Sequence, residues 1–195
     1  MGTWTPWGRS DNSVRHAPGV MEYSTPGHGG YRLSPSVDVL VPGPLRELGK
    51  VGRHTGWYEE DLCYAVVHFC FPALFSAEQV ENARDVLKNW YPDAYMAATG
   101  EWLEEKDSRV LRERALRATL KDKYVGVTAW GDWHDKVPAG MVAVRCVKGG
   151  RDERGGFVTN DEKHLLVPEP DYAKSGPLGF VVEDPAKYTE VVGGL

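Results

Sequence analysis

The spacing of apolar residues changes near residue 125, and this change constrains the fold more than any other feature of the sequence. Between residues 55 and 124, apolar side chains recur at intervals of three and four, as in Leu62, Val66 and Phe69, which is the period of a helix with one buried face. After Val125 apolar and polar residues alternate instead, which is the period of a strand. The sequence therefore predicts an α+β fold in which a mostly antiparallel sheet packs against a helical layer.

Four helices are expected in the middle part of the chain. The first has Thr55 as a capping residue, carboxylates in its first turn that complement the helix dipole, and Pro72 at its end. Ser76 and Gln79 have the spacing of a capping box and predict the start of the second helix. Gly100 interrupts the third. The four expected helices cover residues 58–71, 76–90, 94–105 and 108–124.

Strands are expected on both sides of the helical part. Residues 20–25 and 31–34 are rich in β-branched and aromatic side chains and flank a Pro-Gly-His-Gly-Gly turn, which predicts a β-hairpin with His28 at its tip. Residues 36–41 are expected to form a further strand. Five later strands, joined as a meander, are expected at residues 125–130, 141–147, 157–159, 164–167 and 180–183, before a short helix at Asp184 and Pro185.

The length of 195 residues favours a single domain over residues 1–195, because one core of that size can bury most of its apolar surface. Residues 1–18, which are rich in Trp, Gly and Pro, are expected to form an irregular N-terminal segment. They lack the pattern of a secretory leader, and the longest apolar stretch is too short to cross about 30 Å of hydrocarbon. Cys63, Cys70 and Cys146 are expected to be buried thiols of a cytoplasmic protein.

Charge is distributed unevenly along the chain. A net charge of −5 argues against general nucleic-acid binding, which depends on many Lys and Arg contacts with phosphate. Residues 51–107 carry eleven acidic against four basic residues, whereas residues 108–123 carry six basic against two. On the last expected helix, Arg114, Arg117 and Lys121 form a basic stripe, a candidate surface for an anionic partner such as nucleic acid. Ion pairs with the neighbouring acidic segment would neutralise this stripe.

His28 lies in the turn-forming sequence Ser-Thr-Pro-Gly-His-Gly-Gly. Gly29 and Gly30 let a backbone approach a ligand closely, and an imidazole titrates near neutral pH, so these three residues are a candidate ligand site. The alternative is an ordinary hairpin turn with an exposed histidine. The sequence contains neither the spacing of a phosphate-binding loop nor that of a dinucleotide-binding turn.

A second turn, Ala-Trp-Gly-Asp-Trp-His-Asp-Lys-Val-Pro, contains His134 next to carboxylates and follows an expected strand. A histidine in such surroundings can act as a base, and we expect, as one alternative, a small hydrolase or transferase with catalytic residues His28, Glu60 and His134. The ligand contacts of such a site would be Gly29, Gly30, Glu59, Asp132 and Trp133. The other interpretation is that the two glutamates belong to a helix N-terminus and that the turn is solvated.

Neither a metal nor an organic cofactor is expected from the spacing of residues along the chain. The six histidines are scattered, and the three cysteines match no zinc pattern. A catalytic thiol is also not expected, because an apolar helix is the opposite of the electropositive, accessible setting that lowers the pKa of a thiol.

Several segments resemble an uncharacterised family of bacterial, phage and plasmid proteins. They are WTPWG, HAPG, STPGHGG, GWYEEDL, KNWYPDAY, AWGDWHDKVPAGMVAV and LVPEPDY, and together they span most of the chain. The resemblance implies an accessory role in a phage or other mobile element, in the cytoplasm of the host cell, and carries no functional residues with it. We therefore expect a protein that binds a host protein or a small ligand, for instance to counter host defence. The hydrolase or transferase and the nucleic-acid-binding protein are the two alternatives.

Overall fold

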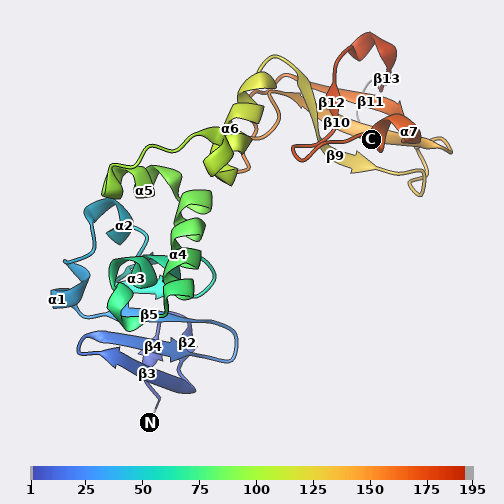
Figure 1. Ribbon diagram of the computed structural model, residues 1–195. Coiled ribbons are helices and arrows are strands. Elements are labelled where there is room, and N and C mark those ends of the chain that lie inside the picture. The colour runs from blue at the N-terminus through green and yellow to red at the C-terminus, as the bar shows by residue number, and fades with distance from the viewer. Residues whose placement is uncertain (1, 192–195) are drawn as a thin grey trace. The chain divides into compact units, whose positions relative to one another are not determined.

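The computed structural model describes residues 2–191 and divides the chain into two compact units, Met1–Arg112 and Glu113–Leu195 (Figure 1). We call them the first and the second unit. Each has a cluster of buried apolar side chains of its own, on which its strands and helices pack. The α+β class, with antiparallel sheets and helices, is confirmed. That residues 1–195 form a single domain stays a prediction.

The first unit contains a four-stranded antiparallel sheet in the order β3 (Asn12–Ala17), β4 (Val20–Ser24), β5 (Gly29–Leu33) and β8 (Trp57–Glu59). The predicted hairpin is confirmed, because β4 pairs with β5 and His28 directly precedes β5. The prediction that residues 1–18 are irregular is wrong for the described residues 2–18, which contain three strands. Besides β3, which is an edge strand of the sheet, they form a small hairpin of β1 (Trp4–Thr5) and β2 (Gly8–Arg9). Its turn is held by the Thr5 hydroxyl, which donates to Gly8 O at 2.8 Å.

The helices of the first unit differ from the prediction at two places. Residues 57–59 belong to strand β8, and helix α3 (Tyr64–Cys70) begins only afterwards, because Trp57 and Tyr58 are buried on opposite faces of the sheet. Residues 36–41 are not a strand: Pro35 sets the first turn of α1 (Pro35–Asp38), and a second short helix, α2 (Gly43–Arg46), follows. Two further hairpin strands, β6 (Lys50–Val51) and β7 (His54–Thr55), precede β8.

Of the other two predicted helices of this unit, the one at 76–90 is confirmed, whereas the one at 94–105 is shorter than predicted, because it ends at Thr99. Helix α4 (Ala77–Trp90) begins with the predicted capping box, in which Ser76 Oγ accepts from Gln79 N and Gln79 Oε1 accepts from Ser76 N. Helix α5 (Pro92–Thr99) ends at Gly100, which has a φ of +75° and a backbone conformation that other residues rarely adopt. The chain also has single turns of 3-10 helix at η1 (Pro72–Leu74), η2 (Glu105–Asp107) and η3 (Pro185–Lys187).

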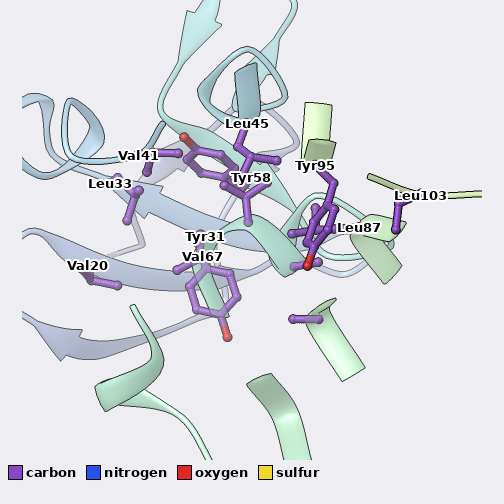
Figure 2. Close-up of a cluster of buried hydrophobic side chains, with 13 residues drawn as sticks. Val20, Tyr31, Leu33, Val41, Leu45, Tyr58, Val67, Leu87, Tyr95 and Leu103 are labelled. Carbon is purple, nitrogen blue, oxygen red and sulfur yellow. The ribbon is translucent and has the colours of Figure 1, made fainter. Parts of the chain in front are cut away.

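The core of the first unit lies between the sheet and the helices (Figure 2). Leu33 and Tyr58 come from adjacent strands, and Val67, Leu87 and Tyr95 come from α3, α4 and α5; all five are fully buried. The buried Tyr58 hydroxyl donates to Asp38 Oδ1 at 2.7 Å, which satisfies its polar group. Helix α3 covers one face of the sheet. On the other face, Trp7 from the small N-terminal hairpin packs against Trp57.

The second unit contains a five-stranded antiparallel sheet in the order β12 (Val181–Val182), β9 (Tyr124–Trp130), β10 (Met141–Lys148), β11 (Glu162–Pro168) and β13 (Thr189–Glu190). The meander is correct for β9, β10 and β11, whereas β12 returns to pair with β9. Residues 157–159 form no strand, only a bridge from Phe157 to Arg151.

Helix α6 (Arg109–Thr119) is shorter than the predicted 108–124, because Tyr124 already pairs in the sheet. A four-residue helix, α7 (Glu169–Tyr172), follows β11, and η3 is the predicted short helix after Asp184. Within residues 2–191, no helix combines the length and the apolar character that crossing a membrane requires.

Candidate functional site

The turn of the β4–β5 hairpin brings His28 next to two carboxylates at the end of β8. The turn is closed by Thr25 N, which donates to His28 O at 2.7 Å, and by His28 N, which donates to Thr25 Oγ1 at 3.1 Å. Strand β8 lies beside β5, with Glu59 opposite Gly30, and Glu60 N donates to Gly29 O at 3.1 Å. The two glutamates therefore reach the same end of the sheet as the histidine.

The three side chains converge. His28 Nδ1 lies 3.9 Å from Glu59 Oε1 and 4.0 Å from Glu60 Oε1, and one potential ligand atom from each residue lies within 4.8 Å of the others. Glu59 Oε2 accepts from Asp61 N at 3.0 Å, whereas Glu59 Oε1 is buried and makes no hydrogen bond among the described residues. Burial raises the pKa of Glu59 above its ordinary value. An imidazole and two carboxylates are ligands that Zn²⁺ and related divalent cations accept.

The adjacent glycines make this convergence sterically feasible. A Cβ atom on Gly29 would collide with Glu60 Oε2 and lie 3.0 Å from Tyr23 O. Gly30 has a φ of +153°, and a Cβ there would lie 2.7 Å from Cη2 of Trp7, whose ring comes from the turn of the N-terminal hairpin. Gly29 and Gly30, which the sequence marked as ligand contacts, thus have a steric role: they let the carboxylates and Trp7 approach the backbone.

His134, Asp132 and Trp133 lie in the second unit, in the turn that follows β9. Asp132 Oδ2 accepts from Gly140 N at 3.2 Å, and His134 Nδ1 lies 3.3 Å from Asp135 Oδ1. These contacts order the turn, and Trp133 is exposed at its surface. A catalytic site that combines His134 with His28 and Glu60 stays a prediction.

The basic stripe on α6 makes ion pairs within the second unit. Arg114 Nε donates to Glu153 Oε1 at 2.7 Å, and Arg117 lies 3.4 Å from Glu113 Oε2, one turn earlier on the helix. Lys121 is exposed. Two of the three cations are therefore partly neutralised locally, by carboxylates other than those of the acidic segment 51–107. An anionic partner at this stripe stays a prediction.

A second polar cluster lies on the α3-facing side of the first sheet, and sequence analysis missed it. His16 Nε2 lies 2.7 Å from Glu22 Oε2, and Tyr31 Oη lies 2.9 Å from His68 Nε2. Glu22 and Tyr31 are direct cross-strand partners, so the four side chains form one row from β3 across β4 and β5 to α3. A signal was present: in Val-Met-Glu-Tyr-Ser, the alternation of strand side chains places Glu22 on the same face as the buried Val20.

Aromatic rings enclose the inner end of this row. The His68 ring stacks on Phe75 with centroids 3.8 Å apart and meets the edge of Tyr64 at 5.0 Å. The residue is 6% exposed, and its Nδ1 is buried without a hydrogen bond among residues 2–191. Burial lowers the pKa of His68, and burial together with the Glu22 carboxylate raises the pKa of Tyr31. Both groups are therefore kept neutral at physiological pH.

Burial raises the pKa of all three cysteine thiols. Cys146 is buried, while Cys63 and Cys70 are only half-buried, so the expectation of buried thiols is confirmed fully for Cys146 alone. Burial raises the pKa of Cys70 to about 11 and that of Cys146 to about 12. Since the thiolate is the nucleophile, these two residues do not offer one at neutral pH.

A family model described as Domain of unknown function (DUF7007) matches residues 1–121. A search of curated proteins and a search of solved structures each found no match. The matched range includes the entire first unit, and with it both the His28 cluster and the row from His16 to His68.

Proposed function

This chain belongs to the DUF7007 family, and we propose that its first unit binds a divalent cation through His28, Glu59 and Glu60 and, through that cation, a small anionic ligand. The single observation that carries the proposal is the convergence of one imidazole and two carboxylates, one of which has a buried oxygen without a hydrogen bond.

Electrostatics favours a cation at this position. Two carboxylates at one end of a sheet repel each other, and the buried Glu59 Oε1 has given up water without a protein donor in return. A divalent cation would remove both costs, because it attracts the two carboxylates and fills the role of the missing donor. Its positive charge would in turn select an anionic ligand.

The number of protein groups supports ligand binding rather than a purely structural role. Three side chains leave at least one position free in a tetrahedral site, which is the arrangement that accepts water or a ligand atom. His28 and Glu60 are exposed, so the free position faces solvent. A cation held by His28, Glu59 and Glu60 would supply a polarised water at such a position.

Isothermal titration calorimetry with Zn²⁺, Mn²⁺ and Mg²⁺ tests the proposal. We expect one site per chain, with affinity at least about tenfold weaker in His28→Ala and in Glu60→Gln, equivalent to about 1.4 kcal/mol. His54→Ala is the matched control, since His54 is an exposed histidine of the same unit. Equal affinity in wild type and both site variants would refute the proposal.

The broader role that we propose is that of an accessory protein of a phage or other mobile element, acting in the host cytoplasm. Its support is the resemblance of the sequence segments, and the ligand could then be part of a host pathway. Affinity capture from host lysate, with wild type compared with Glu60→Gln, tests this role. A host small molecule or protein retained by the wild type alone would support it, and identical capture by both would contradict it.

Two alternatives lead to different experiments. For a hydrolase or transferase that includes His134, His134→Ala should abolish turnover of the ligand without altering cation affinity. For nucleic-acid binding, charge reversal at Arg114 and Arg117 should abolish salt-sensitive retention on DNA. The ion pairs of both arginines argue against the second alternative.

A further inference from the structure

We propose that a cavity of the first unit binds a small oxyanion that also carries a hydroxyl group, with inorganic phosphate as the simplest example, through the guanidinium groups of Arg32 and Arg46. The cavity has a volume of about 290 Å³ and is lined by residues of α1, α2, β5, β6 and β7. Pockets for small molecules begin at about this size. The site is separate from the cation cluster, because Arg32 lies four residues from His28, which is roughly 13 Å along an extended strand.

Arg32 and Arg46 differ from the other half-buried arginines among the described residues, because they make no ion pair. The other four each lie within 3.4 Å of a carboxylate oxygen; they are Arg84, Arg114, Arg117 and Arg145. A guanidinium cannot lose its charge by losing a proton, so partial burial without a carboxylate leaves an uncompensated cation. Both uncompensated arginines line the same cavity, which favours an anion from outside the protein.

Arg32 is fixed in place and still has donors to offer. Its Nη1 donates to Thr55 O at 2.7 Å, and its guanidinium carbon lies 5.4 Å from the centroid of the Trp57 ring. A Cβ atom on Gly56 would collide with Arg32 Nη1, so this glycine keeps free the space that the guanidinium occupies. A guanidinium has five N–H donors, and the others make no hydrogen bond to residues 2–191. Arg32 is therefore a preorganised donor for an oxyanion.

Arg46 brings a second guanidinium to the cavity, from helix α2. Its side chain makes no hydrogen bond within the described part of the chain, yet its charge acts on the buried Tyr58. Burial and the Asp38 carboxylate raise the pKa of Tyr58, and Arg46 opposes them. The planar fork of a guanidinium matches two oxygens of a phosphate or a carboxylate. The cavity thus offers two such forks, from β5 and from α2.

The other charged groups of the cavity indicate which oxyanion fits. Lys50 pairs with Glu47, so their charges cancel. Asp38 is the second carboxylate, and its Oδ1 accepts from the Tyr58 hydroxyl at 2.7 Å. Three basic and two acidic groups leave the cavity with a net charge of +1, which favours an anion.

Asp38 determines that this anion should carry a hydroxyl group. A carboxylate repels an anion that has acceptor oxygens alone, whereas it accepts a hydrogen bond from an anion that has a hydroxyl. Hydrogen phosphate combines the negative charge with the hydroxyl. Sulfate has the same tetrahedral shape but no hydroxyl at neutral pH. The cavity is therefore expected to distinguish the two ions.

Calorimetric titration of the full chain with inorganic phosphate and with sulfate at neutral pH tests this inference. The protein is first freed of divalent cations on a chelating resin. We expect one phosphate per chain and at least about tenfold weaker affinity for sulfate. Arg46→Ala should weaken phosphate binding at least about tenfold. Arg53→Ala is the matched control, because Arg53 is an exposed arginine of the same unit that does not line the cavity. Circular dichroism checks that each variant is folded.

A further variant addresses Asp38. Asp38→Asn should reduce the difference in affinity between phosphate and sulfate, because an amide donates a hydrogen bond to a sulfate oxygen. If Asp38→Asn does not fold, the comparison of the two ions in wild type decides. Equal affinity of the wild type for phosphate and sulfate would refute the hydroxyl-bearing oxyanion as the ligand.

The proposal is overturned if the cation-free wild type binds no phosphate at millimolar concentration, or if folded Arg46→Ala binds it as tightly as wild type. An equal loss in Arg53→Ala would also overturn it, because the attraction would then come from the general positive charge and not from the cavity. Phosphate binding that appears only after a divalent cation is added would assign the anion to His28, Glu59 and Glu60 instead.

Discussion

Position 29 requires a glycine because Glu60 occupies the space that a side chain would need. At the scale of single residues, this is a direct steric requirement of the cluster of His28, Glu59 and Glu60. Gly27, two residues earlier in the same hairpin turn, has nothing within 4 Å of the position of a Cβ atom. The two glycines therefore offer a matched pair of substitutions.

We predict that Gly29→Ala displaces the Glu60 carboxylate from His28 and weakens divalent-cation binding at least about tenfold, that is by about 1.4 kcal/mol. Gly27→Ala should leave the affinity unchanged, because its added methyl group points into open space. Calorimetric titration of both variants with a divalent cation measures the two affinities. Equal affinities would show that Glu60 is not a ligand.

Burial also predicts how much a single apolar side chain contributes to the free energy of unfolding. Leu87 of α4 is fully buried in the core, whereas Leu40 is 69% exposed. Leu87→Ala should lower the free energy of unfolding by about 2–5 kcal/mol, since it leaves a cavity. Leu40→Ala should change it by less than about 0.5 kcal/mol. Urea denaturation followed by circular dichroism compares the two, and similar losses would contradict the described core.

At the scale of elements, helix α3 packs on the sheet through a buried polar contact as well as through apolar ones. Its residues Val66 and Val67 are fully buried, and His68 adds the hydrogen bond to Tyr31 of β5. Phe75, which follows η1, covers the imidazole on one face. Because His68 is enclosed in its neutral form, its protonation should weaken the contact between α3 and the sheet.

His68 makes the first unit sensitive to acid. Burial lowers the pKa of His68 in the folded protein below its ordinary value of 6.5. At pH values between this lowered pKa and 6.5, the unfolded chain therefore binds more protons than the folded one. Its contribution to stability is therefore complete above about pH 6.5 and is lost as the pH falls through this interval. Glu22 and His16 lie nearby and contribute opposite charges to the same region.

We predict that the free energy of unfolding of wild type falls between about pH 7 and about pH 5, and that His68→Gln has a flatter dependence over this range. His54→Gln, which alters an exposed histidine, should keep the wild-type slope. Urea denaturation at several pH values gives these slopes. A wild-type slope in His68→Gln would mean that another group causes the acid sensitivity.

At the scale of the whole molecule, the two units have separate clusters of buried side chains. The cluster of the first unit runs from Val20 to Leu103, and that of the second from Val142 to Val182. The family match ends at residue 121, shortly after the division between the units at Arg112 and Glu113.

We predict that a fragment of residues 1–121 folds by itself, unfolds cooperatively and retains divalent-cation binding, because it contains every residue of the first cluster and of the cation site. Limited proteolysis of the full chain should likewise leave a stable N-terminal fragment. If the fragment is unfolded and proteolysis leaves no stable half, the chain is the single domain that its length suggests.

Local signals accounted for the elements that were predicted correctly. The capping box of α4, the glycine that ends α5 and the turn between β4 and β5 each depend on residues close in sequence. The errors have a common cause as well. Strand β8 lies in a segment whose capping residue and carboxylates are typical of a helix start, but it pairs with β5, which is distant in sequence. Such a pairing cannot be recognised from the residues around either strand alone.

The sequence by itself determined the α+β class, the main helices and the hairpin that presents His28, because periodicity, caps and turns act over a few residues. As one alternative it also suggested His28 and Glu60 as catalytic residues, together with His134, and Glu59 as a ligand contact. Only the tertiary structure decided that β8 lies beside β5, which brings those carboxylates to the imidazole, and that β3 pairs with β4 so that His16 meets Glu22. Both groups of side chains depend on strand register, and register is set by the packing of the whole sheet rather than by any one segment.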